Sequence, residues 1–264
     1  MINLEETKNY AVKSLQEVLE ELEKEKLTRE VSLKEQRDIV TNIDIYIEKE
    51  MIKKLKKQYS NHYFSSEEAG EAKINEEEKD IYEWVIDPID GTINFAADLP
   101  WFSTSICLKH NNKIVIGIVY IHSTKDWYTA ILGQGSYCNG KPIHVSNTKT
   151  LDKSILSFML TSHYTEEQTD YILGIVRNLS LKTRGLRLLV SQAIELCLIA
   201  SGKLDGTVCI KSRGFSSSAG ALIVQEAGGK VTTIDGKERD TKANSLLVSN
   251  GLIHDELVKE SNIK

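Results

Sequence analysis

Two aspartates lie three residues apart in the stretch WVIDPIDGTINF, which covers residues 84–95. Asp87 ends an apolar run, a proline stiffens the chain after it, and Asp90 precedes a glycine and a threonine. Carboxylates this close repel one another unless a proton or a cation lies between them. Oxygen ligands suit Mg²⁺, Mn²⁺ or Ca²⁺ better than zinc. The spacing therefore predicts that Asp87 and Asp90 hold a hard divalent cation.

A second pair of acids, Glu67 and Glu68, follows the stretch HYFSS, so four carboxylates can converge. Beside the aspartates, Gly91 and Thr92 can turn backbone N–H groups toward an anion, as a helix start does. A cation, an amide cradle and a hydroxyl together suit phosphoryl hydrolysis, because the cation activates water and neutralises phosphate charge. The alternative is structural, since D-P-x-D-G-T is an ordinary turn composition in which the aspartates cap a turn and a helix.

The elements that must position these residues follow from the hydrophobic pattern. Helical spacing predicts helices over residues 3–26 and 42–58, with a short strand at HYFSS and a charged loop at 71–80. The following segments are β-rich and separated by turn signals. We expect them to form an antiparallel sheet, with strands at 82–87, 103–110, 113–122, 126–132 and 135–140.

After residue 150 the pattern changes to alternating strands and helices, which favours an α/β arrangement. The expected strands are 154–160, 181–186, 205–210, 230–234 and 245–250, and the expected helices are 165–179, 188–201, 217–227 and 251–260. We therefore expect two intimate subdomains. Residues 1–150 would form an α+β part that carries the metal site, and residues 151–264 an α/β part that forms the substrate wall.

Composition narrows the class of protein. The chain has 264 residues and a formal net charge of −5, so the basic footprint of a nucleic-acid-binding protein is missing. No apolar run approaches the roughly 20 residues that span a bilayer. The N-terminal stretch is acidic and amphipathic, so we expect a cytoplasmic protein without membrane partners. The four cysteines form no C-x-x-C pair, which favours reduced thiols over a zinc site.

Several motifs, in order along the chain, resemble the inositol monophosphatase family. WVIDPIDGTINF resembles the family signature, DIVTNID at 38–44 resembles its D-x-V-T-x-x-D motif, and SEEAG at 66–70 its G-E-E region. The hairpin region at 117–146 and the segments at 193–206 and 219–232 extend the resemblance over nearly all of the chain. The resemblance implies a layered α-β-α-β-α sandwich, that is, a mixed α+β and α/β fold.

The resemblance also implies a ligand set. Glu67 and Asp87, with the carbonyl of Ile89, would hold a first Mg²⁺, and Asp87 and Asp90 would share a second. Glu68 would support a third, weaker ion, and Mn²⁺ could replace Mg²⁺.

The catalytic roles follow from the same resemblance. Thr92, hydrogen-bonded to Asp44, would orient the attacking water with the help of Glu67. The backbone amides of Gly91 and Thr92 would hold oxygens of the phosphate.

The second family signature, W-D-x-A-A-G, is altered in this chain. The aligned stretch FSSSAG places Ser216 where the family has an aspartate that ligates the second metal and touches the substrate. A neutral hydroxyl is a poorer ligand for a hard dication and removes one negative charge. Another interpretation is that Ser216 or Ser217 is the N-cap of a helix, and a hydroxyl there can also bind phosphate.

The substrate wall departs from the family as well. Val190 and Gln192 stand where the family has small residues, and Cys209 stands where inositol monophosphatases have a glutamate that contacts the inositol ring. Ser191 and Arg187 belong to the same wall, and Arg187 could reach an anionic group or pair with an acid. Inositol-phosphate-like compounds, sugar phosphates and bisphosphates, and nucleotide 3′-phosphates are therefore all candidate substrates.

The sequence thus predicts a hydrolase, a Mg²⁺-dependent phosphomonoesterase in which water attacks a small phosphorylated metabolite. The main alternative is a weak or inactive relative that binds a phosphorylated metabolite or a protein partner, which the altered residues 190, 209 and 216 favour. A transfer of phosphate by the same site is a third reading. The resemblance also implies a homodimer, with Trp101 as a candidate interface residue.

Overall fold

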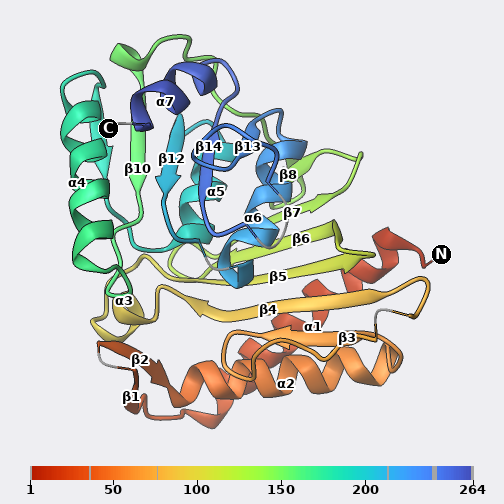
Figure 1. The fold of residues 1–264 in the computed structure, drawn as a ribbon. Helices are drawn as coiled ribbons and strands as arrows, with labels where there is room; N and C mark the ends of the chain where they lie inside the picture. The colour runs from red at the N-terminus through yellow and green to blue at the C-terminus, as the bar shows by residue number, and fades with distance from the viewer. Residues whose placement is uncertain (1, 36, 76, 213, 240–242, 263–264) are drawn as a thin grey trace.

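The protein is built from two large β-sheets and three layers of helices, as Figure 1 shows. The structure, a computed structural model, describes residues 2–262 apart from 36, 76, 213 and 240–242. Helices α1 and α2 cover the seven-stranded sheet from one side, α5 and α6 lie between the sheets, and α4 and α7 cover the five-stranded sheet from outside. The predicted α-β-α-β-α sandwich is confirmed.

The helices begin and end close to their expected positions. Their bounds are α1 Leu4–Glu25, α2 Asn42–Gln58, α3 Thr92–Ala96, α4 Glu166–Ser180, α5 Gln192–Ala200, α6 Gly214–Glu226 and α7 His254–Ser261, with a 3₁₀ turn at Leu151–Lys153. None of the helices in the described part of the chain has the length and apolar composition needed to cross a bilayer.

The larger sheet has the strand order β3-β4-β5-β6-β7-β8-β9. Its strands are β3 Tyr63–Ser66, β4 Tyr82–Asp90, β5 Ser103–His110, β6 Lys113–Ile121, β7 Asp126–Ile131, β8 Ser136–Cys138 and β9 Lys141–Pro142. All neighbouring pairs are antiparallel except β3 and β4, which run parallel. The predicted antiparallel sheet is therefore confirmed from β4 onward. Strand β3 is added at the edge of this sheet and runs parallel to β4.

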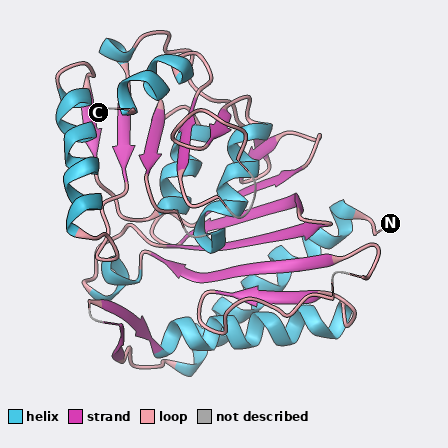
Figure 2. Ribbon diagram, viewed as in Figure 1, coloured by secondary structure: helices cyan, strands magenta, loops and turns pink. Residues whose placement is uncertain are grey.

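The smaller sheet is mixed, with the strand order β11-β10-β12-β14-β13 (Figure 2). Its strands are β10 Ile155–Phe158, β11 Gly185–Arg187, β12 Gly206–Cys209, β13 Lys230–Thr232 and β14 Leu246–Ser249. Strands β10, β11 and β12 run parallel, whereas β14 pairs antiparallel with both β12 and β13.

Alternation of side chains along the strands explains the three separate cores. In β4, Trp84 and Ile86 face α1 and α2, while Val85 faces α5 and α6. In β12, Val208 faces α4 and α7, while Cys209 faces α5 and α6. Each sheet is apolar on both faces, so each needs a helical layer on both sides.

The structure corrects several expected boundaries. A β-hairpin that was not predicted, β1 Val31–Glu35 and β2 Asp38–Thr41, leads into α2. Helix α5 begins at Gln192 rather than at 188, because Val190 adopts a left-handed backbone angle of φ 55° that no α-helix contains. Helix α6 begins at Gly214, three residues before the expected start. The strand expected at 181–186 is shorter and begins later, as β11 at Gly185–Arg187.

Candidate active site

Asp44 is held in place by the start of helix α2. Thr41 is the N-cap, its hydroxyl and backbone N–H both donate to Oδ2 of Asp44, and Asp44 closes a capping box. The residue is 1% exposed, and burial raises the pKa of its carboxyl to about 6 while the bonds from Thr41 oppose the shift. The hairpin β1–β2 thus delivers an acid to the end of strand β4.

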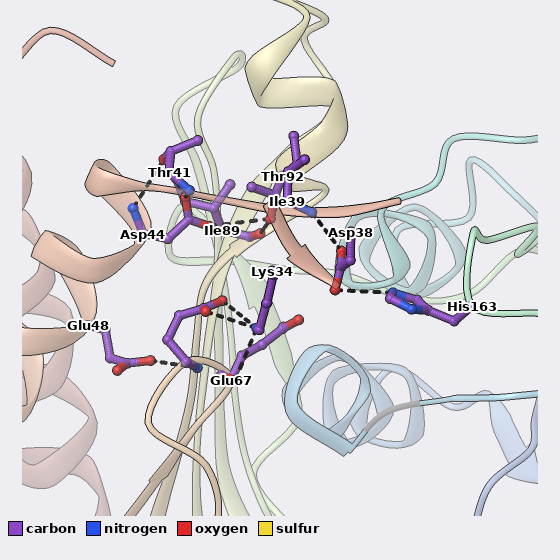
Figure 3. A network of polar contacts seen from close by, with 11 residues as sticks. Lys34, Asp38, Ile39, Thr41, Asp44, Glu48, Glu67, Ile89, Thr92 and His163 are labelled. Atoms are coloured by element: carbon purple, nitrogen blue, oxygen red, sulfur yellow. Dashed lines mark hydrogen bonds and ion pairs between the residues drawn. The ribbon is translucent and has the colours of Figure 1, made fainter. Parts of the chain in front are cut away.

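Thr92 connects Asp44 to the end of β4. Its Oγ1 lies 3.3 Å from Oδ1 of Asp44 and 2.9 Å from the carbonyl oxygen of Ile89 (Figure 3). Before it, Gly91 has a φ of +91°, and a Cβ at this position would come within 2.7 Å of the Trp101 carbonyl oxygen. Only glycine fits this turn, which allows the chain to enter helix α3 directly after β4.

Asp87 is a buried carboxylate that receives no hydrogen bond from the part of the chain that the structure describes. It is 1% exposed, and both of its oxygens lack a hydrogen-bond partner among the described residues. Burial raises the pKa of its carboxyl well above the usual value, and the charges of Glu67 and Asp90 raise it further. Such a group indicates a partner that is not part of the chain.

Asp90, by contrast, has donors at the start of helix α5. The hydroxyl of Ser191 and the backbone N–H of Ala193 donate to Oδ2 at 2.6 and 2.8 Å, and the N–H of Gln192 lies 3.3 Å from Oδ1. Burial raises the pKa of Asp90 to about 6, while the bonds from Ser191 and Ala193 lower it. The capping alternative is thus partly right, but Asp90 caps α5, whereas Gly91 occupies the cap position of α3.

Glu68 carries an ion pair that the sequence did not suggest. Nζ of Lys34, on strand β1, lies 2.9 Å from the Glu68 carboxylate and 3.4 Å from the carbonyl oxygen of Glu67 (Figure 3). The backbone N–H of Glu68 donates to Oε2 of Glu48 at 3.0 Å. The ammonium group of Lys34 therefore lies where a third cation would compete for Glu68.

A cavity of about 180 Å³ opens over these residues. The lining comes from both halves of the chain: Asp38, Glu67, Ile89, Asp90, Gly91, Thr92, Ile93, Met159, Leu160, Thr161, Ser162, His163, Val190, Gln192, Cys209, Lys211 and Ser216. At its rim, Nε2 of His163 lies 3.5 Å from Oδ2 of Asp38 (Figure 3). The lining therefore holds three acids and the cationic Lys211, while the side chains of Gln192, Cys209 and Ser216 are neutral.

The candidate ligands are of the type that a hard cation prefers, but their side chains do not yet converge on one point. Glu67 and Asp90 lie close enough to Asp87 for their charges to raise the pKa of its carboxyl. Every candidate ligand atom is an oxygen. In the described part of the chain, no three His, Cys, Asp or Glu side chains converge as a finished set of ligands. Like charges diverge when nothing joins them, so binding would draw the carboxylates together.

The comparisons with known proteins agree with this geometry. The sequence model of the "Inositol monophosphatase family" matches residues 3–263 of the chain. The chain belongs to this family. Family membership supports a phosphatase that acts on phosphomonoesters.

Relatives match along most of their length. The "Fructose-1,6-bisphosphatase/inositol-1-monophosphatase" of Thermotoga maritima is 33% identical over 226 residues, which is 86% of this chain and 83% of the relative. "Inositol monophosphatase 1" of Bos taurus is 35% identical over 231 residues, or 86% and 82%. The solved structure of a Thermotoga maritima IMPase superposes with a TM-score of 0.85 at 31% identity, covering 96% of both chains.

Within this inositol monophosphatase fold, the structure brings together most of the predicted site. Eight predicted residues line the cavity: Glu67, Ile89, Asp90, Gly91, Thr92, Val190, Cys209 and Ser216. Asp44, Asp87, Glu68 and Ser191 lie behind this lining and contact or influence its members. Arg187 lies apart on β11, where its side chain is exposed and donates to the carbonyl of Leu186, so its role stays a prediction.

The serines of the altered signature do not lie at the N-cap of a helix, where one interpretation of the sequence placed Ser216 or Ser217. Ser216, Ser217 and Ser218 are inside helix α6, not before it, and the position before Gly214 lies outside the described residues. Ser218 donates to the carbonyl of Gly214, and Ser217 accepts from Arg239. The interpretation of Ser216 or Ser217 as an N-cap is therefore wrong, which leaves the Ser216 hydroxyl in the cavity wall without a capping role.

Three ionisable cavity residues were missed in the sequence, namely Asp38, His163 and Lys211, as was the uncharged lining at 93 and 159–162, and Lys34 lies close by. Asp38 was visible as the first residue of the DIVTNID motif. The other three stand in polar segments without a recognisable pattern, and the fold brings them to the site from strand β1, from the loop after β10 and from the segment after β12.

Proposed function

We propose that the protein is a Mg²⁺-dependent phosphomonoesterase for a small phosphorylated metabolite, with Mn²⁺ as an alternative ion. The observation that supports this most directly is the buried carboxylate of Asp87, which has no hydrogen-bond donor among the described residues and lies near Glu67 and Asp90. Neutralising three such acids requires protons or cations, and their oxygen atoms suit Mg²⁺. Asp87, Glu67, Asp90 and the carbonyl of Ile89 would hold two ions.

The chain's own residues would orient the reactants. A bound cation would lower the pKa of its water and neutralise charge on the phosphate. The single hydroxyl proton of Thr92 lies within reach of Asp44 Oδ1 and of the Ile89 carbonyl oxygen, so the lone pairs of the Thr92 oxygen could accept from and orient a water molecule. Gly91 and Thr92 line the cavity, and the first N–H groups of α3 have no partner within the helix, so these amides would hold oxygens of the phosphate.

The test is the release of phosphate from a panel of phosphomonoesters with Mg²⁺, with Mn²⁺ and with a chelator. We expect metal-dependent release by the wild type, and a decrease of at least about 100-fold in Asp90→Asn, because this variant loses a charged ligand but keeps an acceptor for helix α5. Lys230→Gln, a change in a surface ion pair far from the cavity, is the control. Release that persists in the chelator or in Asp90→Asn would contradict the proposal.

A second candidate function rests on the altered wall. Ser216 and Cys209 line the cavity, Ser216 in place of an acid, and burial raises the pKa of the Cys209 thiol to about 11, so neither residue carries a charge at neutral pH. A relative that binds a phosphorylated metabolite or a protein partner without turnover would have such a wall. Ser216→Asp separates the two: a large gain in turnover indicates a decayed enzyme, and loss of an existing activity indicates a reshaped one.

We also propose a cytoplasmic homodimer. All four cysteines are free, which suits a reducing compartment. The side chains of Trp101 and Leu188 are 41% and 51% exposed. The two segments lie close together, because the side chain of Asn94 donates hydrogen bonds to the carbonyl oxygens of Trp101 and Leu189. These apolar side chains beside the active site are candidates for contact with a second copy of the chain.

A further inference from the structure

Gln192 has a buried side chain whose amide nitrogen lacks a regular hydrogen-bond partner in the described part of the chain. The residue is 2% exposed and lines the active-site cavity next to Ser216. Its Oε1 accepts hydrogen bonds from Ser212 Oγ at 2.9 Å and from Ser216 Oγ at 3.5 Å. Its Nε2 has no hydrogen-bond partner of regular geometry among the described residues, although the carboxamide lies close enough to the Cys209 thiol to lower the pKa of that group. A buried polar atom without a partner costs about 1–3 kcal/mol, so its presence calls for an explanation.

The same residue also contacts a candidate metal ligand. The backbone N–H of Gln192 lies 3.3 Å from Oδ1 of Asp90, while its side chain reaches Ser216 on helix α6. The backbone of Gln192 thus contacts Asp90, and its carboxamide contacts Ser216, the position from which the charged side chain is missing. Serine is too short to reach an ion from that position, whereas the carboxamide group of Gln192 already lies beside the serine hydroxyl.

The carboxamide can present its oxygen to the cavity without losing a hydrogen bond. A half-turn about the last side-chain bond exchanges Oε1 and Nε2, which have nearly the same shape. The hydroxyls of Ser212 and Ser216 then accept from Nε2 instead of donating to Oε1, and the oxygen takes the place without a partner. Carboxamide oxygens are ordinary ligands of hard dications, so a bound cation would select this orientation.

We propose that Gln192 supplies, through its carboxamide oxygen, the ligand for the second cation that Ser216 no longer provides. This inference rests on the proposed metal-dependent function. The replacement ligand is neutral, so the centre keeps one negative charge fewer than it would with an acid at 216. The second ion is therefore bound more weakly, and the loaded centre attracts an anionic substrate more strongly.

The test is a calorimetric titration of Mg²⁺ and of Mn²⁺ into the metal-free protein. Gln192→Leu keeps the size of the side chain but removes the oxygen, and we expect the affinity for the weaker ion to fall roughly tenfold or more. Gln192→Glu adds a charged ligand of the same shape, and we expect a gain of about tenfold. Gln134→Leu and Gln134→Glu, in the exposed turn between β7 and β8, control for hydrophobicity and net charge and should match the wild type.

A rescue experiment separates ligation from a structural role. Ser216→Asp in the Gln192→Leu background should restore the affinity, whereas a residue that only supports the fold would change the melting temperature in chelator and leave the affinity unchanged. Equal affinities of wild type and Gln192→Leu, or weaker binding by Gln192→Glu, would overturn the inference alone. Absence of metal binding in the wild type would overturn the proposed function as well. If Gln192→Leu does not fold, Gln192→Glu decides.

Discussion

Val190 is the residue in the active-site wall whose backbone conformation suits its side chain least. A φ of 55° is rare for a branched side chain, because Cβ crowds the backbone there. The neighbouring carbonyl of Leu189 accepts a hydrogen bond of 2.8 Å from Asn94, which also binds the carbonyl of Trp101. These bonds hold the segment against its local preference, as is common at functional sites.

We expect Val190→Gly to stabilise the protein by about 1 kcal/mol. Relief of strain contributes roughly 1–3 kcal/mol, and the greater freedom of glycine in the unfolded chain offsets about 0.5–1 kcal/mol of it. Val190→Ala keeps a Cβ at the same φ and should gain less. Urea denaturation of the three proteins measures the difference. A less stable Val190→Gly protein would show that side-chain packing of Val190 outweighs its strain.

At the scale of elements, helix α5 connects the candidate metal centre to a buried acid. Its first N–H groups bind Asp90, and one turn further Glu195 is fully buried between the sheets. Oε2 of Glu195 accepts from Thr207 at 2.9 Å, and Oε1 has no hydrogen-bond partner among the described residues. Burial raises the pKa of Glu195 to about 7, although the bond from Thr207 opposes the shift.

This pKa makes a prediction for the pH dependence of stability. The pKa of Glu195 is higher in the folded state than in the unfolded chain, so its contribution is fully present below about pH 4.5 and is lost as pH rises through about 7. The loss is of the order of 3 kcal/mol. Glu195→Gln should remove it, so the variant should gain stability over the wild type at pH 8 but not at pH 4.5. Equal pH dependence in chemical denaturation of both proteins would contradict this.

At the scale of the whole molecule, the candidate metal centre lies between the two halves of the chain. The cavity is lined by β4 and α3 on one side and by α5, β12 and α6 on the other. An ion bound there would therefore stabilise the contact between both sheets and their shared helical layer, and not one hairpin alone. Thermal unfolding of the whole protein should respond to Mg²⁺.

We expect Mg²⁺ at about 100 times its Kd to raise the melting temperature by roughly 5–10 °C relative to chelator, because ligand binding adds about 2.7 kcal/mol. Asp87→Asn should abolish this gain, and in chelator it should melt above the wild type because a buried charge is removed. Na⁺ at equal ionic strength is the control. A similar gain with Mg²⁺ in Asp87→Asn would show that the ions bind elsewhere.

Much of the fold could be predicted from local patterns. Helix α2 begins and ends at the predicted residues 42 and 58, because a strong amphipathic period and a capping threonine define it. The boundaries of α5 and α6 were wrong, since the left-handed Val190 and the start of α6 at Gly214 depend on contacts between segments far apart in the chain. The hairpin β1–β2 was not predicted, although its second strand begins the DIVTNID motif, because both strands are too short to show a clear alternation.

The sequence by itself determined the candidate donor chemistry: Asp87, Asp90 and Glu67 as predicted oxygen ligands, Thr92 after them in the same motif, and a serine at 216. Residue type and short spacing suffice for that, because chemistry depends on functional groups. Only the tertiary structure decided that Asp90 binds the start of α5, that Lys34 pairs with Glu68, and that Gln192 reaches Ser216. These contacts join residues 20 or more positions apart, and their geometry depends on how the layers pack, which no local pattern encodes.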